Sequence, residues 1–199
     1  MVLANKNPSS HQELRYREGN KENKKLIELD DGNKVIIRPL NGADMRKLVR
    51  FYTNLSKETL YYRYFSSASN LISQELKRVK QALQRGALIL AAESLDEDQR
   101  PIVGISEILQ CGTLDSAECA VIVTETWQGK HLGWQMLEWL IYLAKEKGIN
   151  RIMGYYIASN QKVNSMLQKA GYKYKTDRHL NVTCFTLFLN LPLKTEDGA

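Results

Sequence analysis

The order of elements in this 199-residue sequence predicts an α/β protein (α+β in detail) with helices on both faces of a mixed, mostly antiparallel sheet. Helical periodicity governs residues 41–85, and strand-like apolar runs replace it between residues 87 and 124. Strand and helix patterns then alternate to the end of the chain. The length and the apolar content of 43% suit a single domain with a core of its own.

The first predicted elements are two strands joined by a tight turn. Short apolar runs at residues 26–29 and 34–38 flank an Asp-Gly turn at residues 30–33, and Pro39 ends the second run. Residues 1–24 hold little apolar material and are predicted to be a polar, disordered extension. The predicted domain therefore covers residues 25–192, and residues 193–199 form a tail.

Three helices are predicted next. The first covers residues 41–55, and the second follows Ser56, whose side chain suits an N-cap. The third covers residues 74–85, with Ser73 as its cap and Gly86 as its stop.

The second half of the chain predicts most of the sheet. Strands are expected at residues 87–92, 101–109, 116–124, 151–157, 172–175 and 183–189, and helices at residues 132–147 and 160–170. The helix at 132–147 is long enough to make its two flanking strands parallel neighbours.

Residues 117–133 form the most informative stretch, because a buried strand runs through a short turn into a glycine-bearing helix start. The first turn of a helix has unpaired N–H groups and a positive dipole end, so this junction suits an anion. Lys130 adds positive charge. The stretch is neither a nucleotide P-loop nor a G-x-G-x-x-G motif, and a glycine-rich turn without a ligand remains the alternative.

Glu118 lies in the otherwise apolar strand of this stretch. Alternation places Ser116, Glu118 and Ala120 on one face of the strand, and Ala117, Cys119 and Val121 on the other. An exposed position at the strand end is one interpretation. In the other, desolvation raises the pKa of the carboxyl towards neutrality, which favours a general base.

Three cysteines and three histidines show no metal-ligand spacing, so no metal is expected. Cys119 is interpreted as a small buried side chain. Asn160 opens the helix at 160–170, and Gly171 and Tyr172 close it. On its own, this asparagine is equally well explained as a helix cap.

Two of these segments resemble the motifs of one enzyme family. Residues 123–133 resemble the Q/R-x-x-G-x-G/A acyl-CoA motif of the GNAT superfamily of N-acetyltransferases, and residues 160–172 resemble its second motif, from Asn to Gly-Tyr. The resemblance covers residues 34–190. It implies acetyl-CoA as co-substrate, a splayed parallel strand pair and direct attack by an amine in a ternary complex. The coenzyme-binding residues it implies are Val121, Ile122, Val123, Gln128, Gly129, Lys130, His131, Leu132, Gly133, Trp134 and Asn160.

A closer resemblance is to the bacterial protein lysine acetyltransferases that modify acyl-CoA synthetases. It rests on the pattern Leu55-Ser56-x-Glu58-x-x-Tyr61-x-Arg63-Tyr64-Phe65 and on the pair Ala117-Glu118. It implies that Glu118 is the general base and that the acceptor is a protein lysine, with a small amine as the alternative.

The sequence departs from the family pattern at two positions. His131 replaces the first motif glycine, which weakens coenzyme binding if the position needs a positive φ and is harmless if the position is helical. Leu167 replaces a tyrosine that serves many relatives as general acid. Tyr155 and Tyr156 are the candidate donors, with a core role as the alternative. The two departures also motivate a second hypothesis, an acyl-CoA-binding regulator without catalysis.

The formal net charge is +6, and half of this excess lies in residues 1–25. A solvated tail explains it better than a nucleic-acid-binding arm, so nucleic acid is an unlikely partner. No apolar run is long enough to span a membrane, and no signal peptide is recognisable, which favours the cytoplasm. A homodimer is compatible with the sequence.

Overall fold

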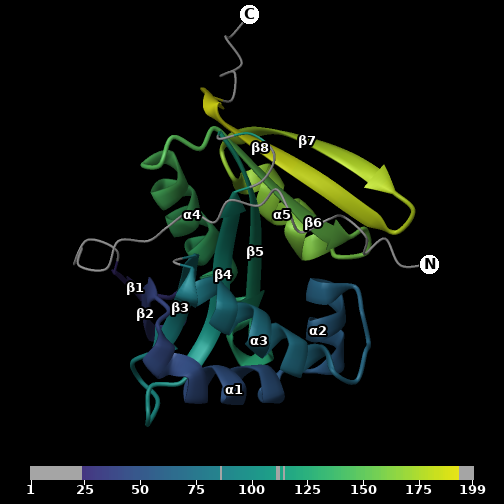
Figure 1. Ribbon diagram of the computed structural model, residues 1–199. Helices are drawn as coiled ribbons and strands as arrows, with labels where there is room; N and C mark the ends of the chain where they lie inside the picture. Colours follow the sequence, from purple (N-terminus) through teal and green to yellow (C-terminus); the bar gives the residue numbers. More distant parts are fainter. Residues whose placement is uncertain (1–23, 86, 111–112, 114, 193–199) are drawn as a thin grey trace, which may run out of the picture.

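The computed structural model describes residues 24–85, 87–110, 113 and 115–192, and these residues form an eight-stranded sheet (Figure 1). The strand order is β1-β2-β3-β4-β5-β6-β8-β7. The strands are β1 (Lys25–Glu28), β2 (Lys34–Pro39), β3 (Leu88–Ser94), β4 (Ile102–Gln110), β5 (Ser116–Val123), β6 (Arg151–Ile157), β7 (Tyr172–His179) and β8 (Val182–Pro192). The predicted extension and tail, and the predicted stop at Gly86, lie outside the described residues, except Lys24.

The helices are α1 (Met45–Asn54), α2 (Lys57–Tyr64), α3 (Leu71–Gln84), α4 (Leu132–Lys145) and α5 (Gln161–Lys169). A 3-10 turn, η2 (Gly42–Asp44), precedes α1 and is capped by Asn41. The prediction that α3 begins at Gln74 with Ser73 as its cap is wrong. The helix begins at Leu71, and the Ser73 hydroxyl donates to the Asn70 carbonyl (2.9 Å) from inside the first turn.

Two apolar clusters occupy the two faces of the sheet, as the alternation of the strands requires. Helices α4 and α5 cover one face, and the hairpin β1–β2 contributes Ile27 and Leu29 to the same cluster. Helices α1 and α3 cover the other face (Figure 1). The predicted mixed, mostly antiparallel sheet with helices on both faces is confirmed.

Strands β5 and β6 form the parallel pair of this sheet and separate soon after they meet. Ser116, Ala117 and Glu118 pair with residues of β6, and the register ends at the pair Glu118 and Met153. Both strands continue, to Val123 and Ile157. We call this opening the fork. It leaves the edge of β5 that faces β6 unpaired along residues 119–123, so the splayed pair implied by the family resemblance is present.

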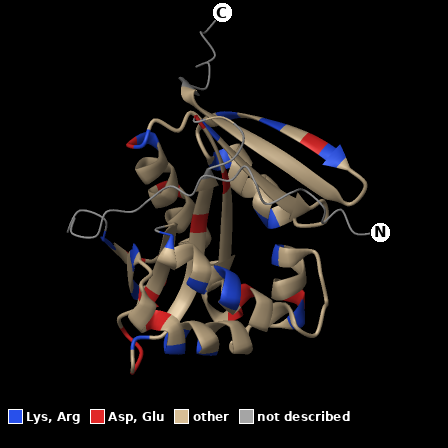
Figure 2. Cartoon of the chain, viewed as in Figure 1, with Lys and Arg blue, Asp and Glu red and all other residues tan. Residues whose placement is uncertain are grey.

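The last two strands are longer than the sequence patterns indicated. The prediction placed them at residues 172–175 and 183–189, whereas β7 runs to His179 and β8 from Val182. Strand β7 is almost wholly exposed and carries both positive and negative side chains (Figure 2). Without a buried face, its second half shows no apolar alternation from which a strand could be predicted.

Candidate active site

Glu118 lies at the base of the fork, at the last position where β5 pairs with β6. Its neighbours Ala117 and Cys119 are buried in the cluster beneath α4, so alternation directs Glu118 to the opposite face, the side of α2. The predicted alternation is therefore confirmed. Glu118 is half-buried rather than fully exposed, which suits a carboxylate that must meet a substrate.

The turn between β5 and α4 has a backbone suited to an anion. Gly129 and His131 both have left-handed conformations (φ 77° and 63°), and His131 is the N-cap residue of α4. The His131 side chain makes no capping hydrogen bond in the described part of the chain, so it leaves the first N–H groups of the helix available to a ligand. Successive N–H groups in such turns form a concave anion site at the positive end of the helix dipole.

His131 therefore needs the positive φ that usually selects glycine, and the alternative of a helical His131 is wrong. Histidine tolerates this region better than most residues. The left-handed conformation still costs a side-chain-bearing residue about 1–2 kcal/mol.

Gln128, the first residue of the motif, fixes the turn to the rest of the site. Its amide nitrogen donates to the carbonyl oxygen of Val123 (3.0 Å) and to the Thr59 hydroxyl (3.2 Å). Its amide oxygen accepts from the Lys162 ammonium (3.3 Å). Lys162, in the first turn of α5, was missed by sequence reasoning because it lies 34 residues from Gln128 and carries no signal of its own within the second motif.

Two aspartates from the β1–β2 turn contact the basic side chains of this loop. The Lys130 ammonium lies 2.8 Å from the Asp31 carboxylate, and the His131 ring contacts the Asp30 carboxylate. Lys130 also lies over the Trp127 ring, 5.1 Å from its centre. The positive charge that the sequence predicted for this loop is thus partly offset.

The other predicted coenzyme residues line the same region or support it. Val121 is half-buried, whereas Ile122, Val123 and Leu132 are buried. A Cβ on Gly133 would lie 3.8 Å from the Val123 side chain, so alanine also fits. Trp134 packs beside the α4 cluster. Asn160 is the N-cap residue of α5, but its side chain makes no capping hydrogen bond in the part of the chain that the structure describes.

The two candidate proton donors face opposite sides of the sheet. Tyr156 is buried, and its hydroxyl donates to the Asn164 side chain. Tyr155 is 49% exposed and lies two residues beyond Met153, so it shares the face of Glu118. Leu167, at the position of the missing tyrosine, is buried in the core. Of the two candidates, Tyr155 is therefore the one on the side where Glu118 could act.

Glu125, which the sequence did not single out, joins the β5–α4 connection to α2. Its carboxylate accepts the backbone N–H of Ser56 (2.9 Å). Partial desolvation raises the pKa of this carboxyl, but hydrogen bonds from Ser56 and Thr59 outweigh it and lower the pKa to about 2. Glu125 therefore stays ionised at neutral pH and is not a general base.

Cys119 is not a nucleophile in this site. Burial raises the pKa of its thiol to about 12, so it is protonated at neutral pH. Within residues 24–85, 87–110, 113 and 115–192, no three His, Cys, Asp or Glu side chains are grouped so that they could hold a metal ion. No described helix has the length and apolar character needed to cross a bilayer.

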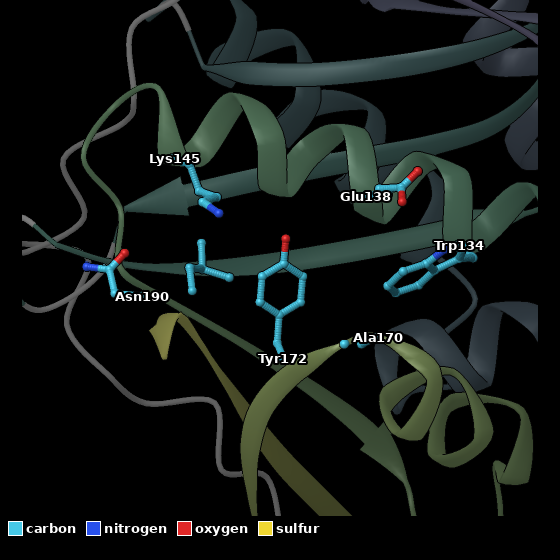
Figure 3. A pocket seen from close by; sticks show the side chains of 8 residues that line it. Trp134, Glu138, Lys145, Ala170, Tyr172 and Asn190 are labelled. Carbon is cyan, nitrogen blue, oxygen red and sulfur yellow. The ribbon is translucent and has the colours of Figure 1, made fainter. Parts of the chain in front are cut away.

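A shallow cavity of about 370 Å³ lies between α4 and the junction of α5 with β7. Tyr172 directs its hydroxyl towards α4 between Lys145 and Glu138, and Trp134 lies at one end (Figure 3). The cavity is on the α4 side of the sheet, whereas Glu118 faces the other side. It is therefore not the place where Glu118 would act.

Comparisons with known proteins agree with this geometry. The model described as "Acetyltransferase (GNAT) family" matches residues 49–172. The chain is 25% identical over 149 residues to the acetyltransferase PA5475 of Pseudomonas aeruginosa, covering 75% of this chain and 80% of that protein.

Solved structures show the same fold. The GNAT domain of PAT from S. lividans has a TM-score of 0.74 and 24% identity, covering 86% of this chain and all of that one. YncA from Salmonella typhimurium, solved with its cofactor acetyl-CoA, has a TM-score of 0.61 and 19% identity, covering 80% and 98%. Spermidine N-acetyltransferase from Vibrio cholerae, in complex with CoA and spermine, has a TM-score of 0.61 and 16% identity, covering 78% and 95%.

Proposed function

Because the chain belongs to the acetyltransferase (GNAT) family, we propose that it transfers an acetyl group from acetyl-CoA to a protein lysine, with Glu118 as the general base. The predictions of the family, of N-acetyltransferase activity and of acetyl-CoA as co-substrate are confirmed at the level of the family. The acceptor and the roles of individual residues belong to the proposal.

The observation that carries the proposal is the position of Glu118 at the base of the fork. A lysine amine with a pKa near 10.4 is almost entirely protonated at pH 7 and cannot attack a thioester in that form. A half-buried carboxylate beside the open edge of β5 is placed to take the proton, directly or through one water.

Each part of the site has a task in this mechanism. The N–H groups of the turn from Gln128 to Trp134 hold the pyrophosphate, which fits their left-handed, uncapped backbone. The open edge of β5 near Val123 holds the pantetheine arm and offers an N–H to the oxyanion. Glu118 first takes a proton from the ammonium, and the neutral amine nitrogen then bonds to the acetyl carbon and releases its second proton to solvent. The C–S bond then breaks, and Tyr155 donates a proton to the departing thiolate.

Two sequence patterns support a protein lysine as the acceptor, namely residues 55–65 and the pair Ala117-Glu118, which resemble the lysine acetyltransferases of acyl-CoA synthetases. Ser56 caps α2, and Arg63 binds β4, while Glu118 lies at the fork. A small amine is the alternative acceptor, as the name of the Vibrio cholerae neighbour illustrates for that protein.

The test is release of CoA from acetyl-CoA across pH 6–9, with lysine peptides, a lysate protein fraction and a polyamine panel as acceptors. Glu118→Gln is expected to lower turnover about 100-fold at pH 7 while the Kd for CoA stays unchanged. Asp177→Asn is the matched control. Asp177 pairs with Cys184 of β8, which pairs with Tyr155 of β6, so this exposed carboxylate lies on the same face of the sheet as Tyr155 and Glu118. In the same assay Tyr155→Phe should slow turnover more than Tyr156→Phe.

Equal turnover by wild type and Glu118→Gln over the whole pH range would remove Glu118 from the mechanism. Turnover with polyamines alone would replace the protein lysine by a small amine. Binding of CoA without turnover on any acceptor would favour the non-catalytic regulator. The cytoplasmic location and the homodimer remain predictions of the sequence.

A further inference from the structure

The β1–β2 turn brings two adjacent carboxylates to the loop at residues 128–133. Asp31 contacts the Lys130 ammonium at 2.8 Å, and Asp30 contacts the ring of His131, some hundred residues away in sequence. Neither aspartate belongs to the acyl-CoA motif. The β1–β2 turn therefore touches this loop at the residue that departs from the motif and at the residue before it.

Internal hydrogen bonds and a buried side chain fix the conformation of the β1–β2 turn, so the turn is rigid enough to position the loop. Its backbone closes through the Leu29 N–H to the Asn33 carbonyl (2.9 Å) and the Gly32 N–H to the Leu29 carbonyl (2.8 Å). The Asn33 side chain donates to the Asp31 carboxylate (2.7 Å). Leu29 is itself buried in the α4 cluster, which anchors the turn to the same layer as the loop.

The backbone conformation of His131 explains why a contact at this residue could matter. Its φ of 63° lies in the left-handed region, which glycine adopts freely and histidine adopts at a cost. The histidine side chain is 66% exposed, so core packing does not hold it in place. The Asp30 carboxylate is the group that contacts the ring.

We infer that Asp30 and Asp31 are positioning residues of the coenzyme site, which hold His131 and Lys130 so that the loop keeps its anion-binding shape without the motif glycine. The inference rests on the proposed role of the loop in binding pyrophosphate. Its rival is simple repulsion, in which two carboxylates near a diphosphate only weaken binding. The two accounts predict opposite effects of removing Asp30.

The test is a mutant cycle on CoA binding by the full chain, measured by calorimetry. Asp30→Ala is expected to weaken CoA binding about threefold, a size typical of exposed ion pairs, and to raise KM for acetyl-CoA with kcat unchanged. In a His131→Gly background the same substitution should have no effect, because glycine holds the left-handed conformation unaided. Asp30→Ala/Asp31→Ala should weaken binding about tenfold with histidine present.

Glu138→Ala is the matched control. Glu138 pairs with Lys25 (3.3 Å), so it forms another exposed ion pair between the first hairpin and α4, away from the loop. This variant should bind CoA as wild type does. Equal weakening by Glu138→Ala would mean that loosening the hairpin, and not positioning of the loop, causes the effect.

Tighter binding after Asp30→Ala in both backgrounds would establish repulsion and overturn the inference. An unchanged Kd with His131 present, or equal weakening in the His131→Gly background, would also overturn it. These outcomes differ from failure of the proposed function, in which wild type itself would not bind CoA.

Discussion

Helices α4 and α2 both contact β5, but different kinds of interaction hold them there. Helix α4 buries a full apolar face, with Leu132, Met136, Leu137, Leu140, Ile141, Leu143 and Ala144. All residues of α2 are described in the structure, and none of them is fully buried. Burial of a large apolar side chain contributes about 1.5–3 kcal/mol, so α4 is held mainly by apolar packing and α2 is not.

Polar contacts fasten α2 at both ends instead. At its start, the Ser56 N–H donates to Glu125, and Thr59 accepts from Gln128 of the motif loop. At its end, the Arg63 guanidinium donates to Glu107 of β4 (2.6 Å). The helix beside Glu118 is thus joined directly to the loop at residues 128–133, and its position depends on charge and hydrogen bonding.

The contact at the end of α2 belongs to a buried network. Glu107 is 5% exposed and accepts from Arg63 and from Arg78 of α3, at 2.6 Å each. Arg78 also donates to Glu75, whose carboxylate accepts the Tyr52 hydroxyl. Desolvation raises the pKa of Glu75, but Arg78 outweighs it and the pKa falls below its ordinary value. The network therefore joins two acidic side chains to two arginines, and their separation would be costly.

The largest expected effect comes from breaking this network. Glu107→Ala leaves two arginines without their shared carboxylate. Removal of one partner of a fully buried pair costs about 3–5 kcal/mol, and the loss here should lie near the lower end because the Arg78 side chain is 38% exposed. Urea unfolding should show this loss. Glu107→Gln, which keeps the shape and one acceptor oxygen, should lose less.

Leu140→Ala in α4 is the apolar counterpart and should cost about 2–5 kcal/mol. Only the Glu107 variants should also loosen α2, as seen by faster hydrogen exchange at Arg63. If Glu107→Ala costs less than about 1 kcal/mol, the network does not fasten the helix.

The same contrast explains what could be predicted from the sequence. Helix α4 follows from apolar periodicity, and the parallel pairing of β5 with β6 follows from the length of their connection. The fork itself was implied only by the family resemblance, and the face on which Glu118 lies follows from alternation along β5. The network could not be predicted, because Arg63, Arg78 and Glu107 lie on three elements that only the tertiary fold brings together.

The conformation of His131 could not be decided from the sequence either. A position just before a helix is compatible with a helical φ, with the extended backbone usual for an N-cap residue and with the left-handed φ found here, and the residue type distinguishes them poorly. The contact between His131 and Asp30 could not be predicted from the sequence either, since it joins a hairpin turn to a loop about a hundred residues later.

A smaller effect is expected from the two helix caps. The Ser56 hydroxyl accepts the Thr59 N–H (3.0 Å), and its loss costs about 1 kcal/mol. Because no residue of α2 is fully buried and only Leu60 and Tyr64 pack against the core cluster, Ser56→Ala should fray this helix with little change in the global free energy of unfolding. Asn41→Ala removes the matching cap before α1, which packs into the core, and should lower global stability by about 1 kcal/mol. An equal global loss in both variants would mean that α2 unfolds only with the whole domain.

The smallest effect is the response of α2 to acid. The pKa of Glu125 is about 2 in the folded protein, against an ordinary value of 4.5. Because folding lowers this pKa, the carboxylate stabilises the fold above pH 4.5, and that contribution disappears as the pH falls from 4.5 towards 2. Glu125 is exposed, so the change should be local and weakened by salt.

Protection of the Ser56 and Thr59 amides, corrected for intrinsic exchange, should therefore fall between pH 4.5 and 2.5 in the wild type and be low and flat in Glu125→Gln. Asp115→Asn is the control, because Asp115 also has a pKa of about 2, lowered by Thr113 and Arg151, but lies at the start of β5. If Glu125→Gln keeps the acid response of the wild type, another carboxylate governs the start of α2.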